Sequence, residues 1–144
     1  SLVNFGGNAP ERDEIEKIIL EWALKVNTPL LGVCRGMQII QDYFENHLTH
    51  ISGHVDTRHN LDVEDNCRLS AAVKRFSDVN SYHEIGSHQV DGNLLQIATS
   101  LDGIVMAVEH REKDLFGVMW HSEREIPFRT EDKLLFKEIF IGER

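Results

Sequence analysis

Cysteine, proline and basic residues are scarce in this sequence. Its 144 residues include two cysteines and three prolines, and acidic residues outnumber basic ones by 24 to 15. Two cysteines are a poor basis for the disulfide framework that stabilises many small secreted domains. We therefore expect a reducing, cytoplasmic setting, in which one well-placed cysteine is a candidate nucleophile.

The charge balance and the lack of long apolar runs exclude two classes of partner. A formal net charge of −9 disfavours nucleic acids and anionic membranes, which usually require a basic patch. No apolar run approaches the roughly 18 residues of a transmembrane helix, and the first residues show no signal-peptide pattern. We expect neither a nucleic acid nor a membrane as a partner.

The length fits one domain that covers residues 1–144. Residues 2–5 predict a strand, which ends at the glycine turn Gly6-Gly7. The chain has no initiator Met and starts inside this strand pattern. We therefore expect the domain to lack some N-terminal residues.

Helical and strand-like segments alternate along the rest of the chain. A helix is predicted over residues 10–25, and a sheet should cover its apolar stripe of Ile15, Ile18, Ile19, Trp22 and Val26. Strands are predicted at residues 30–33, 79–82, 94–99, 104–109 and 115–120, and further helices at residues 37–44, 69–76 and 130–139. The remainder of residues 46–78 is predicted to be a polar loop. This order predicts an α/β fold of three layers, in which helices flank a mostly parallel central sheet with antiparallel additions.

The sharpest local signal is Gly32-Val33-Cys34-Arg35-Gly36, which lies between a predicted strand and a predicted helix. A G-x-C-x-G pattern at such a junction is typical of a nucleophile elbow, in which small residues permit a sharp turn. A helix N-terminus also lowers the pKa of a thiol, so Cys34 is a candidate nucleophile. A buried structural cysteine in a strand-to-helix turn fits the same pattern.

A second candidate segment, Trp120-His121-Ser122-Glu123, follows the last predicted strand. A cysteine nucleophile needs a base, and the base needs a carboxylate that orients it. His121 and Glu123 are two residues apart, so both side chains can leave the strand end on the same side. An exposed histidine and glutamate in an ordinary loop would give the same local sequence.

Three segments together, residues 32–38, 79–83 and 108–123, resemble class I glutamine amidotransferases. The resemblance is closest to their γ-glutamyl hydrolase branch, which is γ-glutamyl-γ-aminobutyrate hydrolase-like (peptidase C26). It implies a flavodoxin-like, three-layer α/β fold and no cofactor or metal. The family usually has proline between the catalytic histidine and glutamate, where this chain has Ser122.

The resemblance also assigns roles to residues. It implies a catalytic triad of Cys34, His121 and Glu123, with backbone N–H groups of Gly7 and Arg35 forming an oxyanion hole. It further implies that the glutamyl group is bound by residues of the glycine turn, the elbow helix and one strand, namely Gly6, Gln38, Ser81, Tyr82 and His83.

The polar stretch contains His47, His50, His54 and His59 at short spacings. Zinc sites normally need more regular scaffolding or more cysteines than this stretch offers, so we expect no metal. Long irregular loops in compact domains are often functional. The stretch is therefore either a plain solvated loop or a specificity loop, in which Arg58 and His59 meet an anionic group of the substrate.

The function predicted from these residues is cysteine-dependent hydrolysis of a γ-glutamyl amide. A small-molecule γ-glutamyl conjugate or glutamine would form a thioester, which water would cleave to release glutamate. One alternative is a glutaminase subunit that delivers ammonia to a synthase partner. Another is a non-catalytic binding or regulatory domain that keeps the fold.

Overall fold

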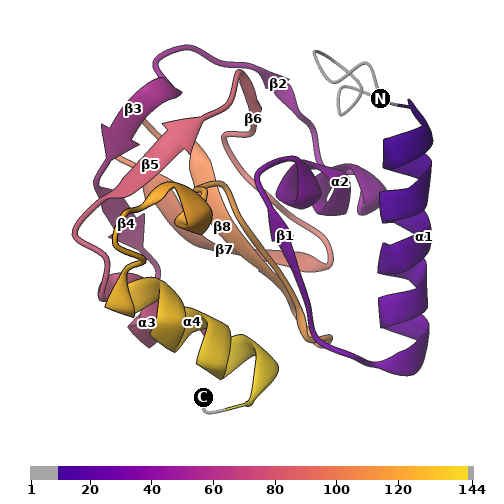
Figure 1. Cartoon of the computed structure of the whole chain (residues 1–144). Helices are drawn as coiled ribbons and strands as arrows, with labels where there is room; N and C mark the ends of the chain where they lie inside the picture. Colours follow the sequence, from indigo (N-terminus) through magenta and orange to yellow (C-terminus); the bar gives the residue numbers. More distant parts are fainter. Residues whose placement is uncertain (1–9, 143–144) are drawn as a thin grey trace.

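The computed structural model describes residues 10–142, which form three layers (Figure 1). The central sheet has the strand order β1-β9-β8-β7-β4, and two short ladders pair β2 with β6 and β3 with β5. The strands are β1 (Leu30–Val33), β2 (Thr49–His50), β3 (Val55–His59), β4 (Leu61–Val63), β5 (Val79–Tyr82), β6 (Ile85–Gly86), β7 (Leu94–Ser100), β8 (Val105–His110) and β9 (Leu115–Val118). The helices are α1 (Pro10–Val26), α2 (Arg35–Tyr43), α3 (Ser70–Lys74), the 3-10 turn η2 (Ser122–Arg124) and α4 (Thr130–Phe140).

Two apolar cores lie on opposite faces of the central sheet. Alternation along β9 divides them, because successive side chains of a strand point to opposite faces. Leu115 packs with residues of α1 and α2, including Leu20 and Ile40. Phe116 belongs to the other core, together with residues of α3 and α4 such as Leu135. Helices therefore flank the sheet on both faces, as the sequence predicted.

The α/β class is confirmed, but the expected share of parallel pairing is not. Among strands within residues 10–142, β1 and β9 pair in parallel, and the other pairs of the central sheet are antiparallel. The reason is the length of the connections. Short turns join β7 to β8 and β8 to β9, and such turns permit only antiparallel neighbours, whereas a parallel pair needs a long crossover.

The polar stretch was predicted to be mostly loop, and this prediction was wrong. It contains β3, which pairs with β5, and β4, which forms the edge of the central sheet beside β7. Both strands are short, and polar residues occupy both of their faces, so neither shows the alternation that marks a half-buried strand. Their partner strands determine their conformation.

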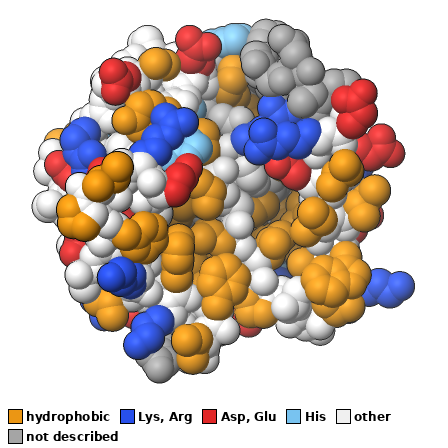
Figure 2. All heavy atoms as spheres, in the orientation of Figure 1, with side chains coloured by type: hydrophobic (Ala, Val, Ile, Leu, Met, Phe, Trp, Pro, Cys, Tyr) orange, Lys and Arg blue, Asp and Glu red, His pale blue; other side chains and the backbone are white. Residues whose placement is uncertain are grey.

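Helix α1 is confirmed, but its predicted packing face is wrong. The apolar stripe is 45–59% exposed and comprises Ile15, Ile18, Ile19, Trp22 and Val26. The buried side of the helix is formed instead by Leu20 and Ala23. Figure 2 shows apolar side chains on the outer surface over α1. The predicted strand at residues 2–5 and the glycine turn lie outside the part of the chain that the structure describes.

No helix within residues 10–142 is long and apolar enough to cross a lipid bilayer.

The two glycines of the elbow provide a test of the fold. A Cβ on Gly32 would lie 2.5 Å from the carbonyl carbon of Gly36, whereas a Cβ on Gly36 would meet no described atom within 4 Å. Gly32→Ala should therefore lower the free energy of unfolding by about 1–3 kcal/mol through overpacking. Gly36→Ala should raise it by up to about 1 kcal/mol, because alanine favours the helix.

Urea unfolding of both variants measures the difference. Equal destabilisation by the two substitutions would show that the close approach of β1 to α2 does not limit this position.

Candidate active site

Cys34 lies between the end of β1 and the first residue of α2. Its backbone has φ 53° and ψ −100°, a left-handed φ that costs free energy for a residue with a side chain. Its N–H donates to the Val118 carbonyl oxygen at 2.7 Å, and its own carbonyl oxygen accepts from the Gln38 N–H at 3.1 Å. Strand and helix therefore both hold the strained residue, as the elbow pattern predicts.

The prediction of a lowered pKa for Cys34 was wrong. The side chain is buried, and loss of hydration raises the pKa of the thiol above its ordinary value. A hydrogen bond from the Arg35 N–H and the positive charge of Arg124 oppose this effect but do not overcome it. The thiol therefore needs a base to become a nucleophile at neutral pH.

His121 and Glu123 form the base pair that the sequence predicted. The His121 Nδ1–H donates to Glu123 Oε2 at 2.8 Å, which leaves Nε2 free to accept a proton. Partial burial would raise the pKa of Glu123, but hydrogen bonds from its own N–H and from His121 hold that pKa below its ordinary value. The carboxylate is therefore ionised and stabilises a protonated imidazole.

Parallel pairing brings the cysteine and the histidine to the same edge of the sheet. Val33 lies beside Val118 in the β1–β9 register. Cys34 directly follows the first of these residues, and His121 follows the second by three positions. Ligands bind at the carboxyl ends of neighbouring parallel strands in open α/β sheets, and the candidate triad lies at such an edge.

Asn80 fixes the backbone of His121, a role that the sequence analysis missed. Its side chain accepts from the His121 N–H at 2.8 Å and donates to the His121 carbonyl oxygen at 2.8 Å. Asn80 is buried on β5, so the pair of bonds ties the catalytic loop to that strand. The segment that carries the family resemblance includes Asn80, but only its last three residues were assigned to the site.

Asp132 holds the same loop from α4 and was also missed. Its Oδ1 accepts from the Ser122 hydroxyl at 2.5 Å and from Trp120 Nε1–H at 3.1 Å. Burial raises the pKa of Asp132, although these two bonds oppose the rise. Ser122, which replaces the usual proline, is buried and donates to Asp132. Its hydroxyl therefore positions the loop.

The predicted glutamyl-binding residues divide into two groups. Tyr82 is half-buried, and its ring lies edge-on to the His121 ring with centroids 6.1 Å apart. The side chains of Gln38, Ser81 and His83 are buried and bonded within the protein, to the Ile85 carbonyl oxygen, to His54 Nδ1 and again to the Ile85 carbonyl oxygen. Tyr82 is therefore the one of these four whose side chain is placed directly against a triad residue.

His83 and Arg35 show how the surroundings of the triad are supported. Burial lowers the pKa of His83 to about 4, so its ring is neutral at physiological pH. The Arg35 side chain forms ion pairs with Asp13 and Glu16 of α1, and it leaves the backbone N–H facing Cys34. That N–H is the oxyanion donor expected from the sequence, and its partner Gly7 lies outside the described residues.

His54 and His59 lie near Asp102 but do not form a convergent metal site. Their rings are stacked with centroids 4.0 Å apart and planes 10° apart. The nitrogen lone pairs therefore run in parallel planes rather than toward one ion. His54 instead bridges Ser81 and Asp102, with 2.9 Å to each. His59 Nε2 lies 3.0 Å from the Gly53 carbonyl oxygen within its own loop.

The charge of Arg58 is already matched. Its guanidinium donates to Asp78 at 2.9 Å and to Glu125 at 2.5 Å, and these partners raise its pKa further. An anionic substrate group would have to displace a carboxylate to reach Arg58. The role predicted for Arg58 and His59 in substrate binding stays a prediction.

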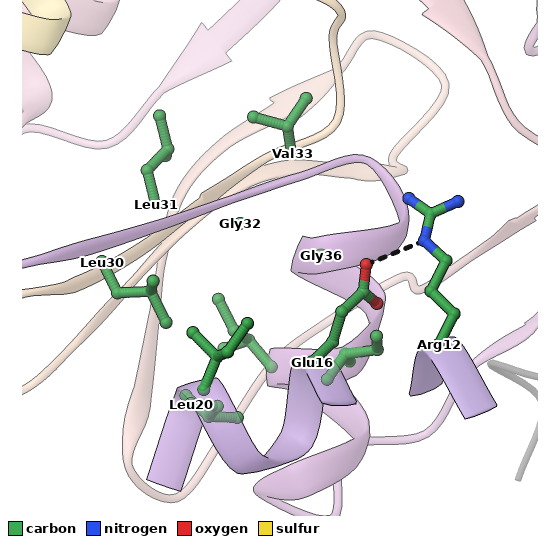
Figure 3. A pocket seen from close by; sticks show the side chains of 11 residues that line it. Arg12, Glu16, Leu20, Leu30, Leu31, Gly32, Val33 and Gly36 are labelled. Carbon is green, nitrogen blue, oxygen red and sulfur yellow. Dashed lines mark hydrogen bonds and ion pairs between the residues drawn. The ribbon is translucent and has the colours of Figure 1, made fainter. Parts of the chain in front are cut away.

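A cavity of about 190 Å³ lies between α1, β1 and α2 (Figure 3). Leu20, Leu30 and Ile40 line its apolar part, and Arg12 and Glu16 lie at its polar side. None of the triad residues lines it. The cavity is therefore separate from the candidate catalytic centre.

The Ser122–Asp132 bond predicts a stability effect. Ser122→Ala removes one of two donors to a buried carboxylate, and it should lower the free energy of unfolding by about 1–3 kcal/mol at neutral pH. Ser77→Ala is the control, because Ser77 is exposed and its hydroxyl makes no hydrogen bond within residues 10–142; it should change stability by less than about 0.5 kcal/mol.

Denaturant unfolding of the two variants at pH 7 is the measurement. If Ser122→Ala were as stable as Ser77→Ala, the clamp on the catalytic loop would contribute nothing to stability.

Comparisons with known proteins agree with this geometry. The family model for peptidase C26 matches residues 3–123. The gamma-glutamyl-CDP-amidate hydrolase of Campylobacter jejuni is 31% identical, over 80% of this chain and 52% of that protein. A putative glutamine amidotransferase-like protein of Lactococcus lactis is 32% identical, over 94% of this chain and 63% of that protein. The chain thus spans about half to two thirds of the length of these relatives.

Solved structures show the same fold at low sequence identity. A glutamine amidotransferase from Thermotoga maritima aligns with a TM-score of 0.69 and 14% identity, over 93% of this chain and 57% of that one. A GMP synthase component from Thermoplasma acidophilum aligns with a TM-score of 0.70 and 18% identity, over 88% of this chain and 62% of that one. The family model, the relatives and the fold agree that the chain belongs to the peptidase C26 family and has the fold of class I glutamine amidotransferases.

Proposed function

We propose that the protein hydrolyses a γ-glutamyl amide through a thioester on Cys34. The observation that carries the proposal is the placement of a strained cysteine and a His121–Glu123 pair at the ends of paired parallel strands. The buried thiol has a raised pKa and needs a base, and His121 is the base that the geometry offers.

Acylation begins with transfer of the thiol proton from Cys34 to His121 Nε2. The sulfur then attacks the γ-carbonyl carbon, and the oxyanion accepts a hydrogen bond from the Arg35 N–H, which faces the thiol. The C–N bond breaks as His121 returns the proton to the leaving nitrogen. Glu123 keeps the imidazole in the required tautomer and stabilises its charged form.

Deacylation repeats the proton transfers with water as the nucleophile. His121 takes a proton from water, which attacks the thioester carbonyl carbon. The C–S bond breaks, glutamate leaves, and the thiol of Cys34 regains its proton. In this scheme Asn80 and Asp132 are positioning residues, because they hold the backbone and the loop that carry His121.

Two observations from relatives bear on the leaving group. One relative is named a gamma-glutamyl-CDP-amidate hydrolase, which supports a free-standing hydrolase with a large leaving group. The GMP synthase of Dictyostelium discoideum is 26% identical, which supports the alternative in which ammonia passes to a synthase partner. Glutaminase activity that appears only with a partner would favour the second candidate. The retained triad residues count against a purely regulatory domain.

Substitution of the triad should separate three roles. Cys34→Ala and His121→Ala should release no glutamate from γ-glutamyl amides above background. Glu123→Gln should retain measurable activity at roughly 10²–10⁴-fold lower kcat, because the carboxylate orients the imidazole without transferring a proton. The assay measures glutamate released from glutamine and from γ-glutamyl conjugates.

Cys67→Ala is the matched control. This second cysteine donates to the Gln96 carbonyl oxygen, and burial raises its pKa to about 11, so the variant should keep wild-type turnover. Loss of activity in Cys67→Ala with full activity in Cys34→Ala would overturn the assignment of the nucleophile.

A further inference from the structure

Arg124 stands at the end of a row of three side chains that begins at the catalytic base. Its guanidinium carbon lies 4.0 Å from the centroid of the Tyr82 ring. The edge of that ring faces His121, with centroids 6.1 Å apart and planes at 72°. The order along the row is therefore His121, Tyr82, Arg124: base, aromatic ring, cation.

Arg124 differs from its neighbours in charge pairing. Arg58 and Arg129 each form ion pairs with Asp78 and Glu125. Arg124 forms no ion pair with any residue between positions 10 and 142, and it is exposed. A guanidinium that lies flat on an aromatic ring keeps its N–H donors free in a fixed plane. Such a group can bind a carboxylate or a phosphate in bidentate fashion.

The chemistry of the proposed reaction tells which half of the substrate meets this row. His121 must protonate the leaving nitrogen, so the leaving group lies on the His121 side of the scissile bond. The glutamyl carbonyl lies at Cys34 and the Arg35 N–H. Tyr82 and Arg124 extend from His121, which places them beside the leaving group.

We propose that Tyr82 and Arg124 form a subsite for a leaving amine that carries a negative charge, a carboxylate or a phosphate. The Tyr82 ring packs against the carbon atoms of the amine, and the Arg124 fork binds the anion. This inference rests on the proposed function and names its substrate class. It also gives a reason for an unpaired cation beside a catalytic centre in a chain with a formal net charge of −9.

The test compares three γ-glutamyl conjugates that share the glutamyl half. γ-Glutamylethylamide has a neutral leaving amine, γ-glutamylglycine has a carboxylate, and γ-glutamyl-2-aminoethylphosphonate has a phosphonate. The readout is the ratio of kcat/KM for each anionic conjugate to kcat/KM for the neutral one. A ratio is used because Arg124 also acts electrostatically on Cys34, so its substitution can change turnover of all substrates.

In the wild type both ratios should exceed one and should fall as salt is added. Arg124→Gln should lower them by at least about tenfold, mainly through KM, as expected for loss of a charge-assisted bond worth about 1.5–3 kcal/mol. Arg124→Lys should restore part of the loss, because it keeps the charge but not the fork. Arg111→Gln is the control: Arg111 is exposed on the turn between β8 and β9, at the opposite edge of the sheet, and the ratios should not change.

The outcomes distinguish the two proposals. A wild type that cleaves no conjugate would overturn the proposed function and this inference together. If the wild type cleaves them and Arg124→Gln lowers kcat/KM by the same factor for all three, Arg124 acts on the shared glutamyl half or on Cys34, and the subsite is refuted. A preference for the phosphonate or for the glycine conjugate that is lost in Arg124→Gln identifies which anion the subsite takes.

Discussion

The candidate catalytic centre depends on the parallel pairing of β1 with β9. The register places Val33 beside Val118, and the Cys34 N–H donates to the Val118 carbonyl oxygen. This one bond ends the ladder and begins the turn into α2. Because β9 runs in the same direction, the chain that leaves it carries His121 to the edge at which Cys34 lies. Antiparallel pairing would send the two residues to opposite ends of the sheet.

Hydrogen bonds from two other elements convert this proximity into a defined geometry. Asn80 on β5 fixes both backbone polar groups of His121, and Asp132 on α4 accepts from the side chains of Trp120 and Ser122. The loop is thus held on two sides by buried polar groups, whose bonds are strong in a low-dielectric interior and costly to break. Proline would stiffen such a turn through the backbone; here a serine hydroxyl and a buried carboxylate hold it instead.

The sequence predicted the parts of this site that depend on local chain geometry. A glycine at position 32 and a cysteine at position 34 specify the elbow, since Gly32 lies where a Cβ would meet the Gly36 backbone. The packing face of α1 could not be predicted, because apolar residues such as Trp22 and Leu20 lie on several sides of the helix, and periodicity does not say which side is covered. The roles of Asn80 and Asp132 depend on contacts between elements distant along the chain, which no local pattern reveals.

The central claim is that Cys34 carries the glutamyl group as a thioester. The most direct measurement is intact-mass analysis of the protein, acid-quenched within the first turnovers with a γ-glutamyl amide. The account predicts a γ-glutamyl adduct that maps to the peptide containing Cys34, is removed by hydroxylamine, and is absent from Cys34→Ala. Glutamate release by the wild type with no adduct on Cys34, or with an adduct on another residue, would contradict it.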